Sequence, residues 1–325
     1  MRGKTLTIIS LSFVLVALVI LFLILDKGEV KLSKDQKKPL IGEFSSKDIT
    51  FFKIFFVDYY DRSKTYDYKI FKSNEMWYVS YSNITDRTDQ KLANFIANII
   101  GDIEKISTIS SNEIIDPIQT LGFVKPNAII EFDTKDKTNK LIIGNLTPTK
   151  DYYYSVLNNN YNEFYLIYAY KIDNITKYPQ ELRDRNLFTP EWTNISGIEY
   201  KPISQNQVMI FTNINQKWFS KTPVENILDS KYIESSFLKD IRSITIQEFI
   251  EDSKLKSKLI SKTNSPLGYI KLFRNNSEGT IMILDKAKTN FYCFDPNRNI
   301  IFSIDYESTH TLFDSNYERF IKIDK

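Results

Sequence analysis

The chain has 325 residues, a formal net charge of +3 and 26% charged residues. So small a charge excess over this length argues against a nucleic-acid-binding protein. The single cysteine, Cys293, and the single histidine, His310, exclude an intramolecular disulfide and any Cys-cluster or multi-His metal site. No two glycines have the spacing of a phosphate-binding loop or a dinucleotide fingerprint, so we expect no nucleotide and no other cofactor.

The first predicted element is an uncharged apolar run from Leu6 to Leu25, preceded by Arg2 and Lys4. At about 1.5 Å per residue, a helix of this length spans roughly the 30 Å hydrocarbon core of a bilayer. A cleavable signal peptide is the alternative, but its apolar region is only about 7–15 residues long and ends in small residues. We therefore expect residues 1–25 to form a cytoplasmic tip and a retained transmembrane anchor, with residues 6–25 in contact with lipid.

The lysines after this run outnumber the basic residues before it, which by the positive-inside rule favours a cytoplasmic body. The rule weakens when a long domain follows, and the short N-terminal arm carries no acidic residue. Together with the resemblance given below, this leads us to expect a single-pass protein of the inner (cytoplasmic) membrane with its body outside the cytoplasm. Residues 26–48 are charged and weakly patterned, and they predict a linker.

Residues 49–190 predict a first module of strands and at least one helix. The helix carries an apolar stripe at the i, i+3, i+4, i+7 and i+8 positions from Leu92 to Ile103. The predicted strands are rich in aromatic and β-branched residues and occupy residues 49–56, 76–81, 128–132, 141–144, 152–154 and 164–167. The last two are joined through three asparagines, which indicates a hairpin.

Residues 191–325 repeat this order of features. Trp218 follows Trp77 by 141 positions, Gly268 follows Gly122 by 146, and Tyr292 follows Tyr154 by 138. Such spacing is too long for solenoid repeats and indicates duplication of a whole domain. Because short turns can join only antiparallel strands, we predict an α+β fold: an N-terminal transmembrane helix, then two tandem duplicated modules, each an antiparallel sheet with a covering helix.

The first module resembles a bacterial domain-of-unknown-function family. The residues that carry the resemblance are Trp77, the helix from Leu92 to Ile103, Thr120-Leu121-Gly122-Phe123, Leu141-Ile142-Ile143-Gly144-Asn145 and Leu182-Arg183-Asp184-Arg185-Asn186-Leu187-Phe188. Members of that family are membrane-anchored proteins often encoded beside gliding-motility-type ABC transporters. The resemblance implies an accessory subunit of an ABC-type export or assembly system, and it supplies no catalytic residues.

Aromatic side chains crowd the predicted hairpin of the first module, with tyrosines at positions 152, 153, 154, 161, 165, 168 and 170. They could line a groove for a peptide or a glycan, and we take Tyr153 and Tyr165 as candidate partner-binding residues. The alternative is ordinary cross-strand packing, which stabilises a sheet by about 0.2–1 kcal/mol for each pair.

Arg183 and Arg185 are the other candidate partner-binding residues, because planar guanidinium groups bind anionic groups through two parallel hydrogen bonds. The alternative is a salt-bridged segment where the second module begins.

Other polar patterns have plainer interpretations. Asp295, Asn297 and Asn299 begin like a calcium loop, but Ile300 replaces the glycine of the sharp turn, so a hairpin turn is favoured. Pairs of acidic residues such as Glu131 and Asp133 could serve a glycosidase only if they faced each other across a cleft.

The sequence thus predicts no catalytic and no metal-binding residues. It favours a membrane-anchored, non-enzymatic accessory protein that binds subunits of an ABC-type export or envelope-assembly system. The alternative is a cell-envelope glycan-binding module or glycan hydrolase that uses strand carboxylates and tyrosines.

Overall fold

The structure is a computed structural model that describes residues 38–40, 46–114, 116–134, 137–188, 192–274 and 277–321. The predicted anchor at residues 6–25 and most of the predicted linker lie outside these residues. None of the helices in the described ranges is both long enough and apolar enough to cross a membrane.

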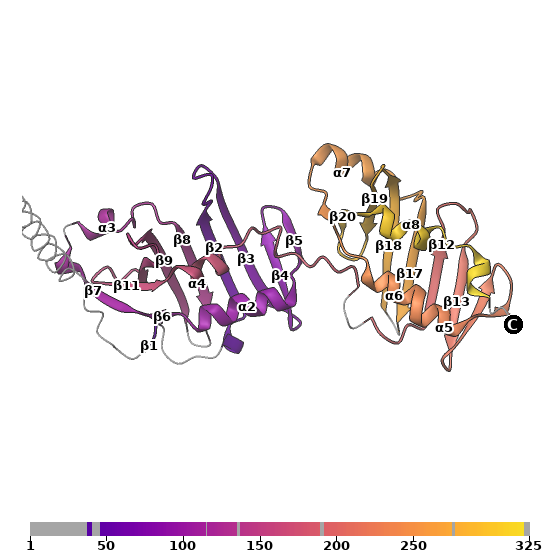
Figure 1. The fold of residues 1–325 in the computed structure, drawn as a ribbon, viewed down its shortest axis with the longest axis horizontal. Helices are drawn as coiled ribbons and strands as arrows, with labels where there is room; N and C mark the ends of the chain where they lie inside the picture. Colours follow the sequence, from indigo (N-terminus) through magenta and orange to yellow (C-terminus); the bar gives the residue numbers. More distant parts are fainter. Residues whose placement is uncertain are drawn as a thin grey trace, which may run out of the picture. The chain divides into compact units, whose positions relative to one another are not determined.

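The chain divides into two compact units. Unit 1 comprises residues up to 75, residues 80–82 and residues 91–179; unit 2 comprises residues 76–79, 83–90 and 180 onward. Most of the first sheet belongs to unit 1, and the second sheet belongs to unit 2 (Figure 1).

The first sheet contains nine strands: Ile84–Arg87 (β5), Met76–Tyr81 (β4), Thr65–Ser73 (β3), Phe51–Val57 (β2), Ala128–Asp133 (β8), Thr138–Leu146 (β9), Tyr152–Leu157 (β10), Glu163–Tyr168 (β11) and Ser107–Ser110 (β7). They lie in that order across the sheet. A separate pair joins Lys38–Pro39 (β1) to Glu104–Lys105 (β6). The helices of this part of the chain are Ser46–Asp48 (η1), Gln90–Gly101 (α2), Ser111–Glu113 (η2), Pro117–Thr120 (α3) and Ala169–Ile175 (α4).

The second sheet also contains nine strands: Asn226–Ile227 (β15), Lys217–Thr222 (β14), Met209–Ile214 (β13), Gly197–Lys201 (β12), Gly268–Arg274 (β17), Ser277–Lys286 (β18), Asn290–Asp295 (β19), Ile300–Asp305 (β20) and Glu248–Phe249 (β16). They too lie in that order. Its helices are Ser230–Tyr232 (α5), the π-helical turn Ile233–Phe237 (η3), Leu238–Ser243 (α6), Ser253–Ile260 (α7), Tyr306–Phe313 (α8) and Tyr317–Phe320 (η4).

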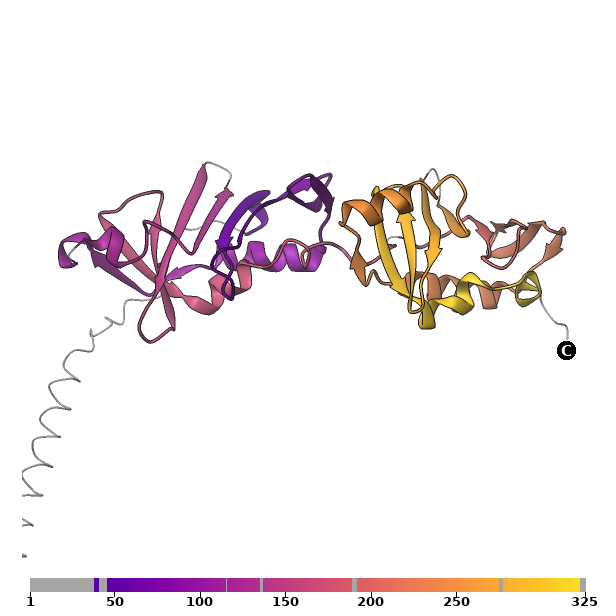
Figure 2. The ribbon, with the colours of Figure 1, turned by 90° about the horizontal axis from the view of Figure 1, so that it is seen from above.

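Alternation of side chains explains the sheets. In β2, Phe52, Ile54 and Phe56 are buried, whereas the residues between them are half-buried. Successive side chains of a strand point to opposite faces, so only one face of β2 is fully covered. Figure 2 shows α2 along one face of the first sheet and α8 along one face of the second. The buried face of α2 consists of Ala93, Ile96, Ala97 and Ile100, whereas Phe95 of the predicted stripe is 48% exposed.

The predicted α+β class is wrong. The fold is mostly β, with two nine-stranded antiparallel sheets, and no described helix can serve as the transmembrane helix that this class included. The strands β7, β15 and β16 were missed because they have only two to four residues, too few to show a period of two. The longer strands β3 and β13 were missed as well.

The strand orders of the two sheets are identical once β2–β5 are matched with β12–β15, β7 with β16, and β8–β11 with β17–β20. Trp77 and Trp218 hold equivalent positions in β4 and β14. The glycine landmark differs: Ala128 pairs with Ile143, and Gly268 pairs with Ile283. Gly268 therefore corresponds to Ala128 and not to Gly122, which precedes the strand.

Candidate functional site

Tyr153 and Tyr165 lie on the neighbouring strands β10 and β11 and are only 8% and 9% exposed. The Tyr153 hydroxyl donates to Asp173 at 3.3 Å, and the Tyr165 hydroxyl donates to Glu163 at 2.7 Å. Burial raises the pKa of the Tyr153 phenol and, with the Glu163 contact, raises the pKa of Tyr165 to about 12. Both side chains are largely buried, and their role in partner binding stays a prediction.

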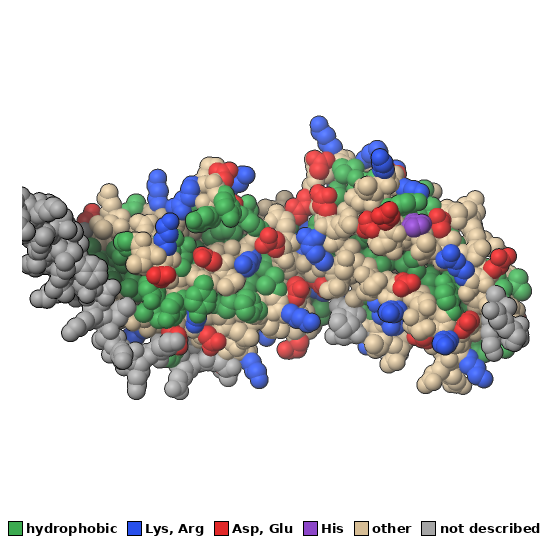
Figure 3. Space-filling view, viewed as in Figure 1, with side chains coloured by type: hydrophobic (Ala, Val, Ile, Leu, Met, Phe, Trp, Pro, Cys, Tyr) green, Lys and Arg blue, Asp and Glu red, His purple; other side chains and the backbone are tan. Residues whose placement is uncertain are grey.

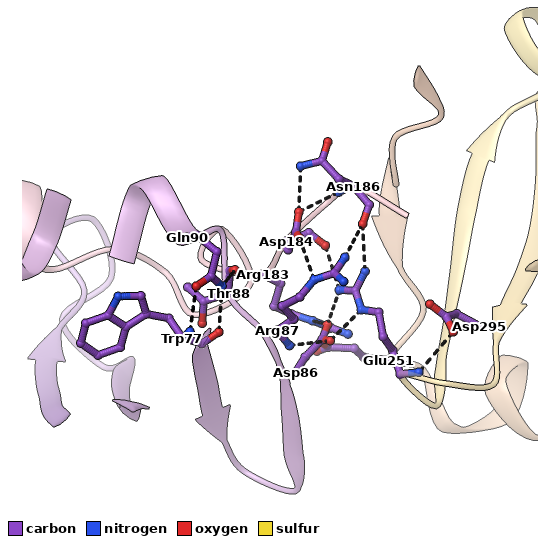
Figure 4. Close-up of polar contacts among 11 residues, drawn as sticks. Trp77, Asp86, Arg87, Thr88, Gln90, Arg183, Asp184, Asn186, Glu251 and Asp295 are labelled. Atoms are coloured by element: carbon purple, nitrogen blue, oxygen red, sulfur yellow. Dashed lines mark hydrogen bonds and ion pairs between the residues drawn. The ribbon is translucent and has the colours of Figure 1, made fainter. Parts of the chain in front are cut away.

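The Arg183 side chain is buried in unit 2, where it makes two ion pairs. Its Nε lies 2.7 Å from Asp86 Oδ2, and its Nη1 lies 2.9 Å from Glu251 Oε1 (Figure 4). The guanidinium carbon is 3.5 Å from the centre of the Phe249 ring, a cation–π distance. These partners hold the Arg183 side chain in one position.

Arg298 supplies the second cation to the same carboxylate. Its Nε donates to Asp86 Oδ1 and its Nη2 to Asp86 Oδ2, both at 2.9 Å. Nη2 also donates to the Asp184 carbonyl at 2.8 Å. Arg87 Nε lies 2.7 Å from Asp184 Oδ2 and completes what we call the ionic cluster: Asp86, Arg87, Arg183, Asp184, Glu251 and Arg298. All of its members belong to unit 2.

The backbone around Arg183 and Arg185 ties the cluster together. The Asp184 amide donates to the Arg87 carbonyl at 2.8 Å, and the Ile246 amide donates to the Arg185 carbonyl at 2.8 Å. The Arg185 guanidinium in turn donates to the Ile246 carbonyl at 3.0 Å. Residues 182–186 are therefore a strap that bridges residues 87–89 to residues 245–246 within unit 2.

The candidate calcium loop is a hairpin turn. Asp295 Oδ1 accepts from the backbone amides of Asn297 at 2.9 Å and Arg298 at 3.2 Å, and Asn299 has a φ of 54°. Burial raises the pKa of the Asp295 carboxyl. Across the described ranges, no group of three or more His, Cys, Asp or Glu side chains is arranged to hold a metal ion. The candidate carboxylate Glu131 pairs with Lys140 at 3.6 Å.

The most exposed aromatic side chains of the described chain lie elsewhere, in the loop between β2 and β3. Tyr59 is 71% exposed and Tyr60 is 89% exposed, and their rings meet edge to face with centres 5.3 Å apart. We call residues 58–64 the tyrosine tip. Figure 3 shows one face of the molecule, with hydrophobic side chains at its surface among charged ones. In the sequence, this loop is marked by a tyrosine pair between Asp58 and Asp61.

Asp58 fixes the shape of the tyrosine tip. Its Oδ1 accepts from the amides of Tyr60 at 2.8 Å and Asp61 at 2.9 Å, and its Oδ2 accepts from the Tyr178 hydroxyl at 3.0 Å. These hydrogen bonds, led by that from Asp61, lower the pKa of the Asp58 carboxyl. The Asp58 amide closes the loop on the Lys64 carbonyl at 2.9 Å. The two exposed rings are thus presented by a preorganised loop.

Comparison with known proteins gives one match. The sequence profile of a family described as "Domain of unknown function (DUF4340)" matches residues 77–262. That span is 186 of the 325 residues, more than half of the chain.

The chain belongs to this family.

A search of curated proteins and a search of solved structures each found no match. The segment shared with the family begins at Trp77 in β4 and ends just after α7. It contains Arg183 and Arg185 with most of the ionic cluster, whereas Arg298 and the tyrosine tip lie outside it.

Proposed function

We propose that this chain is a non-enzymatic accessory protein that binds protein subunits of an ABC-type export or envelope-assembly system. It would work at the inner membrane, with residues 6–25 in contact with lipid and the body outside the cytoplasm. The length of the apolar run supports the membrane contact. The lysine count by itself favours a cytoplasmic body, so the orientation is supported by the length of the domain that follows, by the absence of acidic residues from the short N-terminal arm and by the resemblance. The resemblance described above supports the class of partner.

The observation that carries the binding role is the tyrosine tip. The two neighbouring rings are exposed to water. Each could bury about 150–250 Å² against a partner protein, and burial of apolar surface favours binding. Tyrosine is enriched among the residues that dominate binding energy at protein interfaces. A loop that is already fixed by Asp58 loses little conformational entropy when it binds, which favours affinity.

The engagement of the candidate carboxylates also favours binding over hydrolysis. Glu131 forms an ion pair with Lys140 at 3.6 Å, and the side chain of Asp58 is used to hold the tyrosine tip. A glycosidase needs two carboxyl groups facing each other across a substrate cleft, about 5–9.5 Å apart.

Affinity purification of the full chain tests this function. A C-terminally tagged protein is extracted with mild detergent, and co-purifying polypeptides are compared for the wild type and for the double variant Tyr59→Ala/Tyr60→Ala. The matched control is Ile214→Ala/Val224→Ala, which removes two exposed apolar side chains of unit 2. We expect a transporter-type polypeptide with the wild type and the control, and at least about tenfold less with the double tyrosine variant.

Recovery of no transporter-type polypeptide with the wild type contradicts the proposal. If the double tyrosine variant recovers as much of that polypeptide as the wild type, the tyrosine tip is not the binding surface. Location is tested separately by fusing Lys325 to a reporter that is active only outside the cytoplasm, and an inactive reporter contradicts the proposed orientation.

Glycan binding is the second candidate function, because exposed tyrosine rings can also stack on sugar rings. A pull-down with purified envelope polysaccharide distinguishes the two. Retention of the wild type that is lost in Tyr59→Ala/Tyr60→Ala favours the glycan, provided that no protein partner co-purifies.

A further inference from the structure

A cleft of ≈ 330 Å³ lies beside the ionic cluster in unit 2. Its lining comes from residues 83–85, Arg183, residues 250–251, Lys256 of α7 and residues 298–301, all of them in unit 2. Sites for small molecules have volumes of about 300–1,000 Å³, so the cleft has room for one small solute.

The wall formed by the two arginines is preorganised. Arg183 is held by Asp86, Glu251 and the Phe249 ring, and Arg298 is held by both oxygens of Asp86. The turn that carries Arg298 is itself fixed by Asp295. A site with fixed walls binds more tightly than one that must be ordered by its ligand.

The charge of the lining favours an anion. It contains three cationic side chains, Arg183, Lys256 and Arg298, and one anionic side chain, Glu251. Asp86 lies outside the lining and pairs with both arginines, so it offsets one further positive charge. Among these five side chains, the cations exceed the anions by one. Arg183 and Arg298 belong to the ionic cluster, whereas Lys256 lies on α7 and is not one of its members.

The remaining polar groups suit a ligand with hydroxyl groups. Asn83 and Asn299 are also among the residues that line the cleft, and their side chains carry amide groups. An amide both donates and accepts hydrogen bonds, as a sugar hydroxyl does. We propose that this cleft binds a small polyhydroxylated carboxylate of the sugar-acid type, with its carboxylate at Lys256 and its hydroxyls at Asn83 and Asn299. The site is independent of the tyrosine tip and of the function proposed above.

Calorimetric titration of the full chain in detergent tests the proposal. The probes are sodium D-glucuronate, D-glucose, which lacks the carboxylate, and sodium acetate, which lacks the hydroxyls. We expect saturable binding of glucuronate alone. In Lys256→Gln the dissociation constant should rise at least about tenfold, because a charge-assisted hydrogen bond is lost.

Lys258→Gln is the matched control, because Lys258 lies on the same helix and does not line the cleft. We expect it to bind glucuronate as the wild type does. Thermal unfolding of both variants checks that each is folded. Absence of saturable binding overturns the proposal, as do equal affinities for glucose or acetate, or equal losses in the two lysine variants.

Discussion

Arg298 and Asp86 are separated by 212 positions in the sequence, yet they form a two-point ion pair in which both carboxylate oxygens accept from the guanidinium at 2.9 Å. The same carboxylate accepts from Arg183, and the Asp86 side chain is only 1% exposed. A buried carboxylate with two cationic partners is stable only while both remain. The ionic cluster therefore holds residues 83–90 against the rest of unit 2.

Removing the shared carboxylate of Asp86 tests whether unit 2 depends on the ionic cluster. Asp86→Ala removes the carboxylate that Arg298 pairs with and leaves Arg183 with Glu251 alone, and breaking such a buried pair costs about 3–5 kcal/mol of folding free energy. We expect urea denaturation, followed by circular dichroism, to show the unit 2 transition at clearly lower urea. Asp67→Ala is the control, because its pair with Lys53 is exposed and worth about 0–1 kcal/mol. Equal shifts in the two variants contradict a structural role for the cluster.

Sequence patterns predicted the elements that local periodicity determines. The alternation of β2 and the stripe of α2 are both properties of a few consecutive residues, and both elements are present. The strand β7 was missed because it is short and because its partner β11 lies more than fifty positions further along the chain. Position in the sheet is set by such distant pairings, which no local pattern records.

The same limit applies to the candidate sites. Alternation shows that the tyrosines of β10 and β11 point to both faces, but it does not show that the faces bearing Tyr153 and Tyr165 are covered. Arg183 was identified as a residue that pairs with carboxylates, whereas Arg298 carried no signal because its partner is so distant.

A second prediction concerns Tyr200, which is fully buried in unit 2. Its hydroxyl donates to the Leu312 carbonyl at 2.8 Å and accepts from the Ser315 amide at 3.0 Å. Tyr200→Phe leaves both backbone groups without that partner, which should cost about 1–3 kcal/mol. Tyr269→Phe is the control, since Tyr269 is only half-buried and its hydroxyl donates to the Glu199 side chain. Chemical denaturation measures the free energy of unfolding of both variants. Equal losses would contradict this prediction.

A third prediction concerns pH and the tyrosine tip. The pKa of Asp58 in the folded protein lies below its ordinary value of 3.8, chiefly because the ionised carboxylate accepts the Asp61 amide. A lowered pKa contributes stability above pH 3.8 that is lost as the pH falls through the folded pKa. We expect the Tyr60 amide to exchange slowly at neutral pH and to lose protection only below that value. In Asp58→Asn this acid-dependent step should disappear, and a step of unchanged size would assign it to another group.

The last prediction concerns Gly122, which precedes β8 and has a φ of +84°. A side chain is strained in this conformation, and a Cβ would lie 2.4 Å from Asn145 Oδ1. Gly122→Ala should therefore destabilise unit 1 by about 1–2 kcal/mol or more, from backbone strain plus the clash. Adding Asn145→Ala removes the clashing atoms and not the strain, so the double variant should recover only part of the loss. If the double variant regains all of the lost stability in a denaturation experiment, the left-handed backbone of an alanine at position 122 has no energetic cost. If it regains none, the contact with Asn145 has no energetic cost.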